Sequence, residues 1–326
     1  MIKLPRIYYL MVNGSATGGE RHSYEHVDIL NDCGFDAYAL HLVGQRHPWC
    51  GAETRVIEGA AFWDNYDQTR DYIVLPETQV SLTTALPGKK VIFNKGLYSG
   101  FNSPEVRRDT ICYPYTNKNV VAAFAVSDHN YQHLEYAFPD IKLFRMYAHI
   151  DCDLFAYRTL SSKKRQIALV VKSNDSLSVL YHILNARARA GKNNLADYKL
   201  IFLEGYTHSQ VAEILGDSLM LISLNTHEGM PRIVLEAMAS GCIIAGHGTG
   251  PLKECLLPEY QFEPDDSLAI ARHVEDIAKA FQENVESVES WNHSTLAARK
   301  MAEAYTKDRQ KRHLLEAWDQ LLCGDR

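Results

Sequence analysis

Short apolar runs alternate with amphipathic stretches along most of the chain. In the first half, a helix is predicted over residues 20–32, where Tyr24, Val27 and Leu30 share one side and Gly34 ends the pattern. The apolar runs predict strands over 6–12, 37–42, 72–75, 90–93 and 120–125. Strands that alternate with helices are typical of parallel α/β architecture.

The same pattern restarts in the second half. Strands are predicted over 167–171, 199–203 and 219–224, helices over 177–188 and 209–215, and a helical pattern from 266 to 280 and again over 296–322. The polar, basic segment 161–166 lies between the two series, and we interpret it as a hinge. We therefore expect two Rossmann-like domains, 1–160 and 161–295, with the C-terminal helix 296–322 packing back on the first.

The composition is that of a soluble globular enzyme, with 46% hydrophobic and 23% charged residues. A net charge of −6 argues against broad binding of nucleic acids, which requires a basic face. The seven cysteines form no C-x-x-C pair, which favours free thiols in a reducing compartment. No apolar run is long enough for a transmembrane helix, and the N-terminus leads into a strand without a cleavage site for a signal peptide.

The most informative stretch is 223–254. Glu228 follows an apolar strand, Pro231 is expected at the first position of a helix, Glu236 lies two turns further on, and Gly241 ends the helix. The N-terminus of a helix has free N–H groups that bind anions, phosphate above all. The stretch therefore predicts a site for a phosphorylated ligand that has hydroxyl groups on both sides of the phosphate.

The spacing of the two glutamates argues against a glycosidase. Eight residues of helix rise about 12 Å, whereas the paired carboxylates of glycosidases lie about 5–9.5 Å apart. The longer span suits the two ends of a nucleotide-diphosphate sugar. The alternative is that both glutamates are structural, either buried or capping.

A glycine-rich turn follows the first predicted strand. Its order, with Gly14 before Gly18 and Gly19, is G-x-x-x-G-G, so it differs from the dinucleotide fingerprint and predicts either a phosphate cradle or a tight turn without a ligand. The histidines of the following helix, His22 and His26, match the H-x-x-E-H pattern of inverted zinc proteases. Because His22 lies directly after the glycines, we expect it to face solvent or the cradle, and we predict no metal site and no cofactor.

The segment EGMPRIVLEAMASG resembles the donor-site signature of the GT-B retaining glycosyltransferases of family four. Further segments resemble the same family: 18–22, 127–129, 150–155, 249–251 with Glu254, and 262–266. The resemblance implies two Rossmann-like domains that face each other across a cleft. It also implies metal-independent transfer of a hexose or related sugar, with retention, from a nucleotide-diphosphate sugar to a saccharide, lipid-linked or other hydroxyl acceptor.

The resemblance also implies roles for individual residues. Glu228 would contact the transferred sugar, Glu236 the ribose, and the amides of Gly229 and Met230 before Pro231 the phosphates. The remaining donor-binding candidates, one pair in each domain, are Gly18 and Gly19, and Thr249 and Gly250.

The chain departs from the family pattern where basic residues and a histidine are usual. Lys172 stands at the first basic position and is the second catalytic candidate besides Glu228. Leu177 offers no charge at the next basic position, so Arg232 or Lys253 would compensate. Asn94 and Lys95 stand where many members have a histidine, which makes Lys95, like His22, a further candidate.

These departures leave two alternatives to a transferase: a nucleotide-sugar-binding protein without transferase activity, and a GT-B nucleotide-sugar epimerase. The family resemblance implies polysaccharide biosynthesis in the cytoplasm, with a peripheral contact at the inner face of the membrane left open. The donor base and sugar, the acceptor and the oligomeric state stay open at this point.

Overall fold

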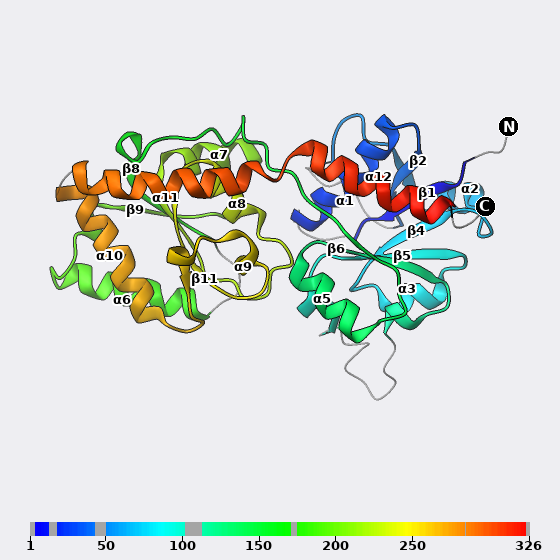
Figure 1. The fold of residues 1–326 in the computed structure, drawn as a ribbon, viewed down its shortest axis with the longest axis horizontal. Coiled ribbons are helices and arrows are strands. Elements are labelled where there is room, and N and C mark those ends of the chain that lie inside the picture. Colours follow the sequence, from blue (N-terminus) through cyan, green and yellow to red (C-terminus); the bar gives the residue numbers. More distant parts are fainter. Residues whose placement is uncertain are drawn as a thin grey trace. The chain divides into compact units, whose positions relative to one another are not determined.

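The computed structural model describes residues 4–12, 18–42, 50–101, 113–170, 175–283 and 285–323. The chain divides into two compact units (Figure 1). Unit 1 comprises Met1–Ala148 and Asp308–Arg326, and unit 2 comprises His149–Lys307.

Unit 1 contains a parallel sheet that has seven strands among the described residues, in the order β3-β2-β1-β4-β5-β6-β7. The strands are β1 (Arg6–Leu10), β2 (Asp36–His41), β3 (Val56–Glu58), β4 (Tyr72–Pro76), β5 (Lys89–Asn94), β6 (Val120–Ala125) and β7 (Leu143–Arg145). The helices are α1 (Gly18–Asp32), α2 (Gly59–Asn65), α3 (Val80–Ala85), α4 (Leu97–Phe101), η1 (Pro114–Thr116), α5 (Asp128–Ala137) and α12 (Lys307–Cys323). The strand order changes direction between β1 and β4, and ligands of such sheets bind at the carboxyl ends of the strands at this point.

The C-terminal helix α12 belongs to unit 1, although it is remote from it in sequence. Trp318 of α12 is fully buried, its indole N–H donates to the hydroxyl of Tyr9 at 3.2 Å, and its ring packs edge-on against Tyr72 and Phe124. Gln310 donates to Glu25 of α1, which agrees with the neighbouring courses of α12 and α1 in Figure 1. Trp318 thus closes the core of unit 1 on one face of the sheet.

Unit 2 contains a second parallel sheet, with five strands among the described residues in the order β12-β11-β10-β8-β9. Its strands are β8 (Lys164–Leu169), β9 (Lys199–Phe202), β10 (Ser218–Ser223), β11 (Ile243–His247) and β12 (Gln261–Phe262). Its helices are η2 (Leu160–Ser162), α6 (Asp175–Arg189), η3 (Leu195–Asp197), α7 (His208–Asp217), α8 (Arg232–Ala239), α9 (Leu252–Cys255), η4 (Pro258–Tyr260), α10 (Ser267–Glu283) and α11 (Val285–Glu303). The strand order changes direction between β8 and β10, so the loop after β10 lies beside this switch point.

The α/β class, with two Rossmann-like sheets and C-terminal helices, is confirmed. The helix expected over 296–322 is two helices, because α11 ends at Glu303 and α12 begins at Lys307. The segment 161–166, expected as the hinge, forms the end of η2 and the start of β8 inside unit 2. Strands β3 and β7 were missed because each is only three residues long and half-buried or exposed at most positions.

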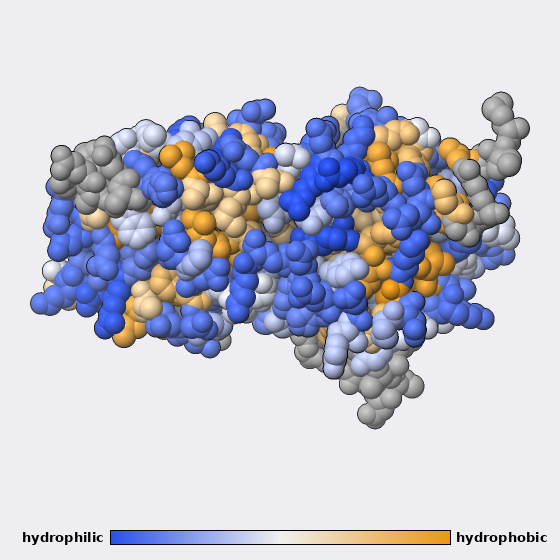
Figure 2. All heavy atoms as spheres, viewed as in Figure 1, coloured by the Kyte–Doolittle hydropathy of each residue, from blue (hydrophilic) through white to orange (hydrophobic). Residues whose placement is uncertain are grey.

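The visible face of each unit is largely hydrophilic, with hydrophobic residues showing between the charged ones (Figure 2). The described cysteines are free thiols. Among the helices that the structure describes, none is both long and apolar enough to cross a membrane.

Candidate functional site

Glu228 lies in the loop between β10 and α8, at the carboxyl end of the unit 2 sheet. The side chain of Asn225 organises this loop. Its amide N–H donates to Glu228 Oε1 at 2.9 Å, and its Oδ1 accepts from the backbone N–H of His227 at 3.0 Å. The half-buried carboxylate is therefore held at the point where the strand ends.

Helix α8 begins one residue later than the sequence predicts. Pro231 is the N-cap, with φ −81° and ψ 75°, and not the first helical residue. Its carbonyl accepts from Val234 N at 3.0 Å and Leu235 N at 3.4 Å, while Arg232 N donates to Met230 O at 2.9 Å in a tight turn. The turn shifts the start of the helix by one position. Pro231 itself has no backbone N–H, so the N-cap position adds no unsatisfied donor.

The start of α8 presents unused donors. In the part of the chain that the structure describes, the backbone N–H groups of Gly229, Met230 and Ile233 have no hydrogen-bond acceptor. The helix dipole places partial positive charge at this same end. Both features favour an anion beside the carboxylate of Glu228.

Glu236 is buried in the second turn of α8, with 8% of its side chain exposed. Its Oε1 lies 3.1 Å from Nε2 of His208, the first residue of α7. The His208 ring in turn packs edge-to-face against Phe155, with ring centroids 4.9 Å apart. Sequence reasoning missed His208, because the pair is 28 residues apart and no local pattern connects the two side chains.

The loop after β11 lies at the same edge of the sheet, because β11 pairs in parallel with β10. Thr249 N donates to His247 O at 2.9 Å, and the Oγ1 of Thr249 is buried without a hydrogen-bond partner in the described structure. Gly250 has φ +50°, which a glycine adopts readily. The structure thus brings Thr249 and Gly250 to the edge that also carries Glu228 and the start of α8.

The basic candidates of unit 2 differ in their surroundings. Arg232 is 8% exposed, and its Nη2 donates to the backbone oxygen of His149 at 3.1 Å, so its guanidinium also serves to anchor the segment that enters unit 2. Lys253 is exposed on α9. Lys172 lies outside the described residues.

A second group of candidates lies at the carboxyl ends of β1 and β5 in unit 1. Gly18 and Gly19 are the first residues of α1, while residues 13–17 of the predicted cradle lie outside the described residues. Glu20 Oε1 lies 3.5 Å from Nζ of Lys95, which follows the last residue of β5. The structure therefore joins Glu20 and Lys95 at the switch point of the unit 1 sheet.

A buried polar network holds the segment around Lys95. The carboxylate of Glu77 accepts from Lys95 N at 3.0 Å, and burial raises the pKa of Glu77. Asn94 donates to the hydroxyl of Tyr115 and accepts from Asn130, both at 2.7 Å. Asn94 is thus a structural member of the network, and the sequence analysis missed Glu77, Tyr115 and Asn130 because they come from separate elements.

His22 and His26 are buried, so of the two expected positions of His22 the solvent-facing one is wrong. The other, facing the cradle, depends on residues 13–17, which lie outside the described residues. Their ring centroids are 4.6 Å apart, and both pack against Phe93 of β5. Nδ1 of His26 lies 3.2 Å from the hydroxyl of Tyr9, and burial lowers the pKa of His26 to about 3. Within the described ranges, no group of three or more His, Cys, Asp and Glu side chains is placed to hold a metal ion.

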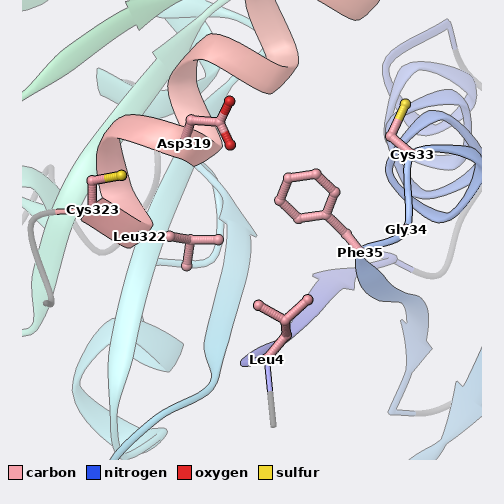
Figure 3. A pocket seen from close by; sticks show the side chains of 7 residues that line it. All are labelled: Leu4, Cys33, Gly34, Phe35, Asp319, Leu322 and Cys323. Carbon is pink, nitrogen blue, oxygen red and sulfur yellow. The ribbon is translucent and has the colours of Figure 1, made fainter. Parts of the chain in front are cut away.

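Two pockets lie away from the predicted residues. The first, of about 150 Å³, is in unit 1 between the end of α1 and the last turn of α12 (Figure 3), and it is lined by Leu4, Cys33, Gly34, Phe35, Asp319, Leu322 and Cys323. It is smaller than the roughly 300–1,000 Å³ typical of small-molecule sites. The second, of about 410 Å³, lies on unit 2 along residues 191–194 and α10, where Asn193 and Glu275 hydrogen-bond to each other. Neither pocket is lined by Glu228 or Glu236.

No family model matches the chain. The chain is 21% identical over 248 residues to the alpha-1,6-glucosyltransferase of Actinobacillus pleuropneumoniae serotype 7 (strain AP76). The matched region covers 74% of this chain and 72% of that protein.

Similar solved structures extend over nearly the whole chain. Sucrose-phosphate synthase from Thermosynechococcus elongatus has a TM-score of 0.70 at 14% identity, covering 98% of this chain and 100% of that one. A TarM mutant from S. aureus, in complex with fondaparinux, alpha-GlcNAc-glycerol and UDP, has a TM-score of 0.69 at 9% identity. The match covers 98% of this chain and 100% of that one. The pneumococcal O-GlcNAc transferase GtfA, in complex with UDP and GlcNAc, has a TM-score of 0.65 at 10% identity, with 98% of each chain covered. The chain therefore has the GT-B fold of these glycosyltransferases.

Proposed function

We propose that the chain is a retaining glycosyltransferase, resembling family four, that moves a hexose or related sugar from a nucleotide-diphosphate sugar to an acceptor hydroxyl. The observation that carries the proposal is the placement of Glu228 and Glu236 on either side of the start of α8, at the carboxyl edge of the unit 2 sheet. Solved GT-B neighbours in complex with UDP, and the similarity to a glucosyltransferase, support the same reading.

In this proposal the donor is bound by unit 2. The unused N–H groups of Gly229 and Met230 bind the diphosphate, Glu236 accepts hydrogen bonds from the ribose hydroxyls, and Glu228 contacts the sugar. Thr249 and Gly250 add a second loop at the same edge. A carboxylate has about four lone-pair sites, so Glu236 has capacity for two hydroxyls in addition to His208.

The chemistry asks the protein for positioning and for electrostatic stabilisation of a leaving diphosphate. The leaving phosphate oxygen takes the proton of the acceptor hydroxyl as the new glycosidic bond forms, so the protein supplies no general base. Lys95, with Gly18 and Gly19, is the proposed contribution of unit 1. The acceptor is a saccharide hydroxyl, carried on a free, lipid-linked or other saccharide.

Donor binding tests the roles of the two glutamates. Isothermal titration of UDP, GDP and ADP and of their glucose and N-acetylglucosamine conjugates identifies the nucleotide. Glu236→Ala should weaken its binding by about 10- to 100-fold, as expected when hydrogen bonds to a charged group are lost, while Glu228→Ala should bind the free nucleotide like the wild type. Glu213→Ala, an exposed glutamate on α7, is the matched control. Equal affinity of wild type and Glu236→Ala would refute the assignment.

Turnover tests the reaction itself. The purified protein, given the donor that binds and a panel of saccharide acceptors, should release nucleotide and form a product whose anomeric configuration, by NMR, equals that of the donor. Glu228→Ala should lower kcat by about 100-fold or more. Inversion of the anomeric centre would refute retention, and conversion of the donor without an acceptor product would indicate an epimerase.

A further inference from the structure

The pairing of Glu236 with His208 joins two helices of unit 2, α8 and α7. His208 opens α7, which precedes β10, while Glu236 lies in α8, which follows β10. Nε2 of His208 and Oε1 of Glu236 are 3.1 Å apart, and 26% of the histidine side chain is exposed compared with 8% of the glutamate side chain. The histidine is therefore the more exposed member of the pair.

The direction of this hydrogen bond follows from the chemistry of the two groups. An ionised carboxylate only accepts hydrogen bonds, so Nε2 of His208 carries the proton that is donated to Glu236. A donor of this kind fixes the rotation of the carboxylate about its last bond, and this prepares Glu236 to accept further hydrogen bonds.

The histidine is itself held in place without a ligand. Thr207 is the N-cap of α7, and a capping box with Gln210 fixes the start of the helix: Gln210 N donates to Thr207 Oγ1 at 3.3 Å, and Thr207 N donates to Gln210 Oε1 at 2.8 Å. Phe155 packs edge-to-face on the ring of His208 and limits its rotation. His208 is thus a pre-organised donor on a rigid element.

We propose that His208 is a positioning residue that orients Glu236 to receive the two hydroxyls of a ribose, and that this pair makes the site selective for ribonucleotides over 2′-deoxyribonucleotides. The inference rests on the proposed function, because it assumes that Glu236 meets the ribose of the donor. A merely structural His208 would change stability but not the preference for the 2′-hydroxyl.

The test measures the dissociation constants of UDP, GDP and ADP, each with its 2′-deoxy counterpart, for the wild type, His208→Ala, His208→Gln and Glu236→Ala. The wild type should bind the ribonucleotide about tenfold or more tightly than its 2′-deoxy form, as expected for one hydrogen bond to a charged group. His208→Ala should weaken the binding of the ribonucleotide about tenfold and leave the affinity for the 2′-deoxy form within about twofold of the wild type, and so remove most of the preference. His208→Gln retains an N–H donor and should keep most of the preference for the ribonucleotide.

The outcomes separate the inference from the proposed function. A wild type that binds none of these nucleotides, or a Glu236→Ala variant that binds them normally, would refute the proposed function and the inference with it. If Glu236→Ala loses the preference while His208→Ala retains it, the inference alone is wrong. Equal weakening of both nucleotide forms in a folded His208→Ala, with the thermal unfolding midpoint as the check on folding, also contradicts it.

Discussion

The ammonium of Lys163 donates a hydrogen bond, at 2.9 Å, to the backbone oxygen of Ser240, the C-cap residue of the helix that carries Glu236. The same Nζ lies 3.1 Å from the carbonyl oxygens of Leu215 and Gly216, in the last turn of α7. One buried cation thus caps the C-termini of both helices that carry the pair, α8 with Glu236 and α7 with His208. Burial lowers the pKa of Lys163, and three carbonyls at the negative ends of two helix dipoles offset this cost.

Lys163→Met should destabilise the protein by about 2–4 kcal/mol, because it leaves buried carbonyl oxygens without their donor while it keeps most of the side-chain volume. Urea unfolding followed by circular dichroism measures the effect. The matched control is Lys164→Met. The Lys164 side chain is 69% exposed and its ammonium is paired with Asp217, so its loss should cost less than about 1 kcal/mol. Equal unfolding midpoints for the two variants would contradict the capping role.

Gly241→Ala should destabilise unit 2 strongly. Gly241 has φ +79°, which confirms its predicted role as the end of α8, and an added Cβ would lie 2.4 Å from the backbone oxygen of Arg158. Left-handed backbone alone costs an alanine about 1–2 kcal/mol, and the clash adds to this. Gly191→Ala is the control, because Gly191 has φ +62° but no atom within 4 Å of its added Cβ. If Gly241→Ala lowers the free energy of unfolding no more than Gly191→Ala does, the backbone of Arg158 moves aside.

His26 should make the stability of unit 1 depend on pH. Burial lowers its pKa to about 3 in the folded state, whereas the unfolded chain binds the proton near pH 6.5. Below about pH 6.5 the unfolded state therefore gains a proton that the folded state does not, and stability falls as the pH falls towards 3, by up to about 1.4 kcal/mol per pH unit.

His26→Gln does not titrate, so its free energy of unfolding should fall less steeply between pH 6 and pH 4 than that of the wild type. Chemical denaturation at several pH values measures both slopes. His133→Gln, at an exposed position of α5, should follow the wild type. Parallel curves for wild type and His26→Gln would mean that His26 becomes protonated inside the fold.

Lys95→Met should lower kcat by at least about tenfold, because it removes a cation beside Glu20 whose side chain is only 12% exposed, and a charge acts strongly where water is largely excluded. The affinity for the free nucleotide, which we assign to unit 2, should stay within about twofold. Steady-state kinetics with the donor and calorimetry with the nucleotide separate the two quantities. Lys89→Met, at the opposite end of β5, is the control, and unchanged turnover in Lys95→Met would exclude a role in catalysis.

Local patterns in the sequence were sufficient to predict most strands, the loop with Glu228, the helix with Glu236 and its end at Gly241. These features depend on residues close together in the chain: an apolar run forms a buried strand, and a glycine supplies the left-handed turn that ends a helix. The shift of Pro231 from the first helical position to the N-cap shows the limit of such reading, since the turn at Met230–Arg232 depends on the backbone conformation of the whole loop.

Only the tertiary structure decided which distant side chains meet. His208 reaches Glu236 across 28 residues, Lys163 reaches Ser240 across 77, and Trp318 reaches Tyr9 across 309. Each pairing depends on the order of the strands in a sheet and on the helix that covers it, and a parallel sheet can bring together segments that are far apart in the sequence. The sequence by itself therefore determined the elements of this protein and its two glutamates, whereas packing decided the partners that hold those glutamates and buried His26 in the core.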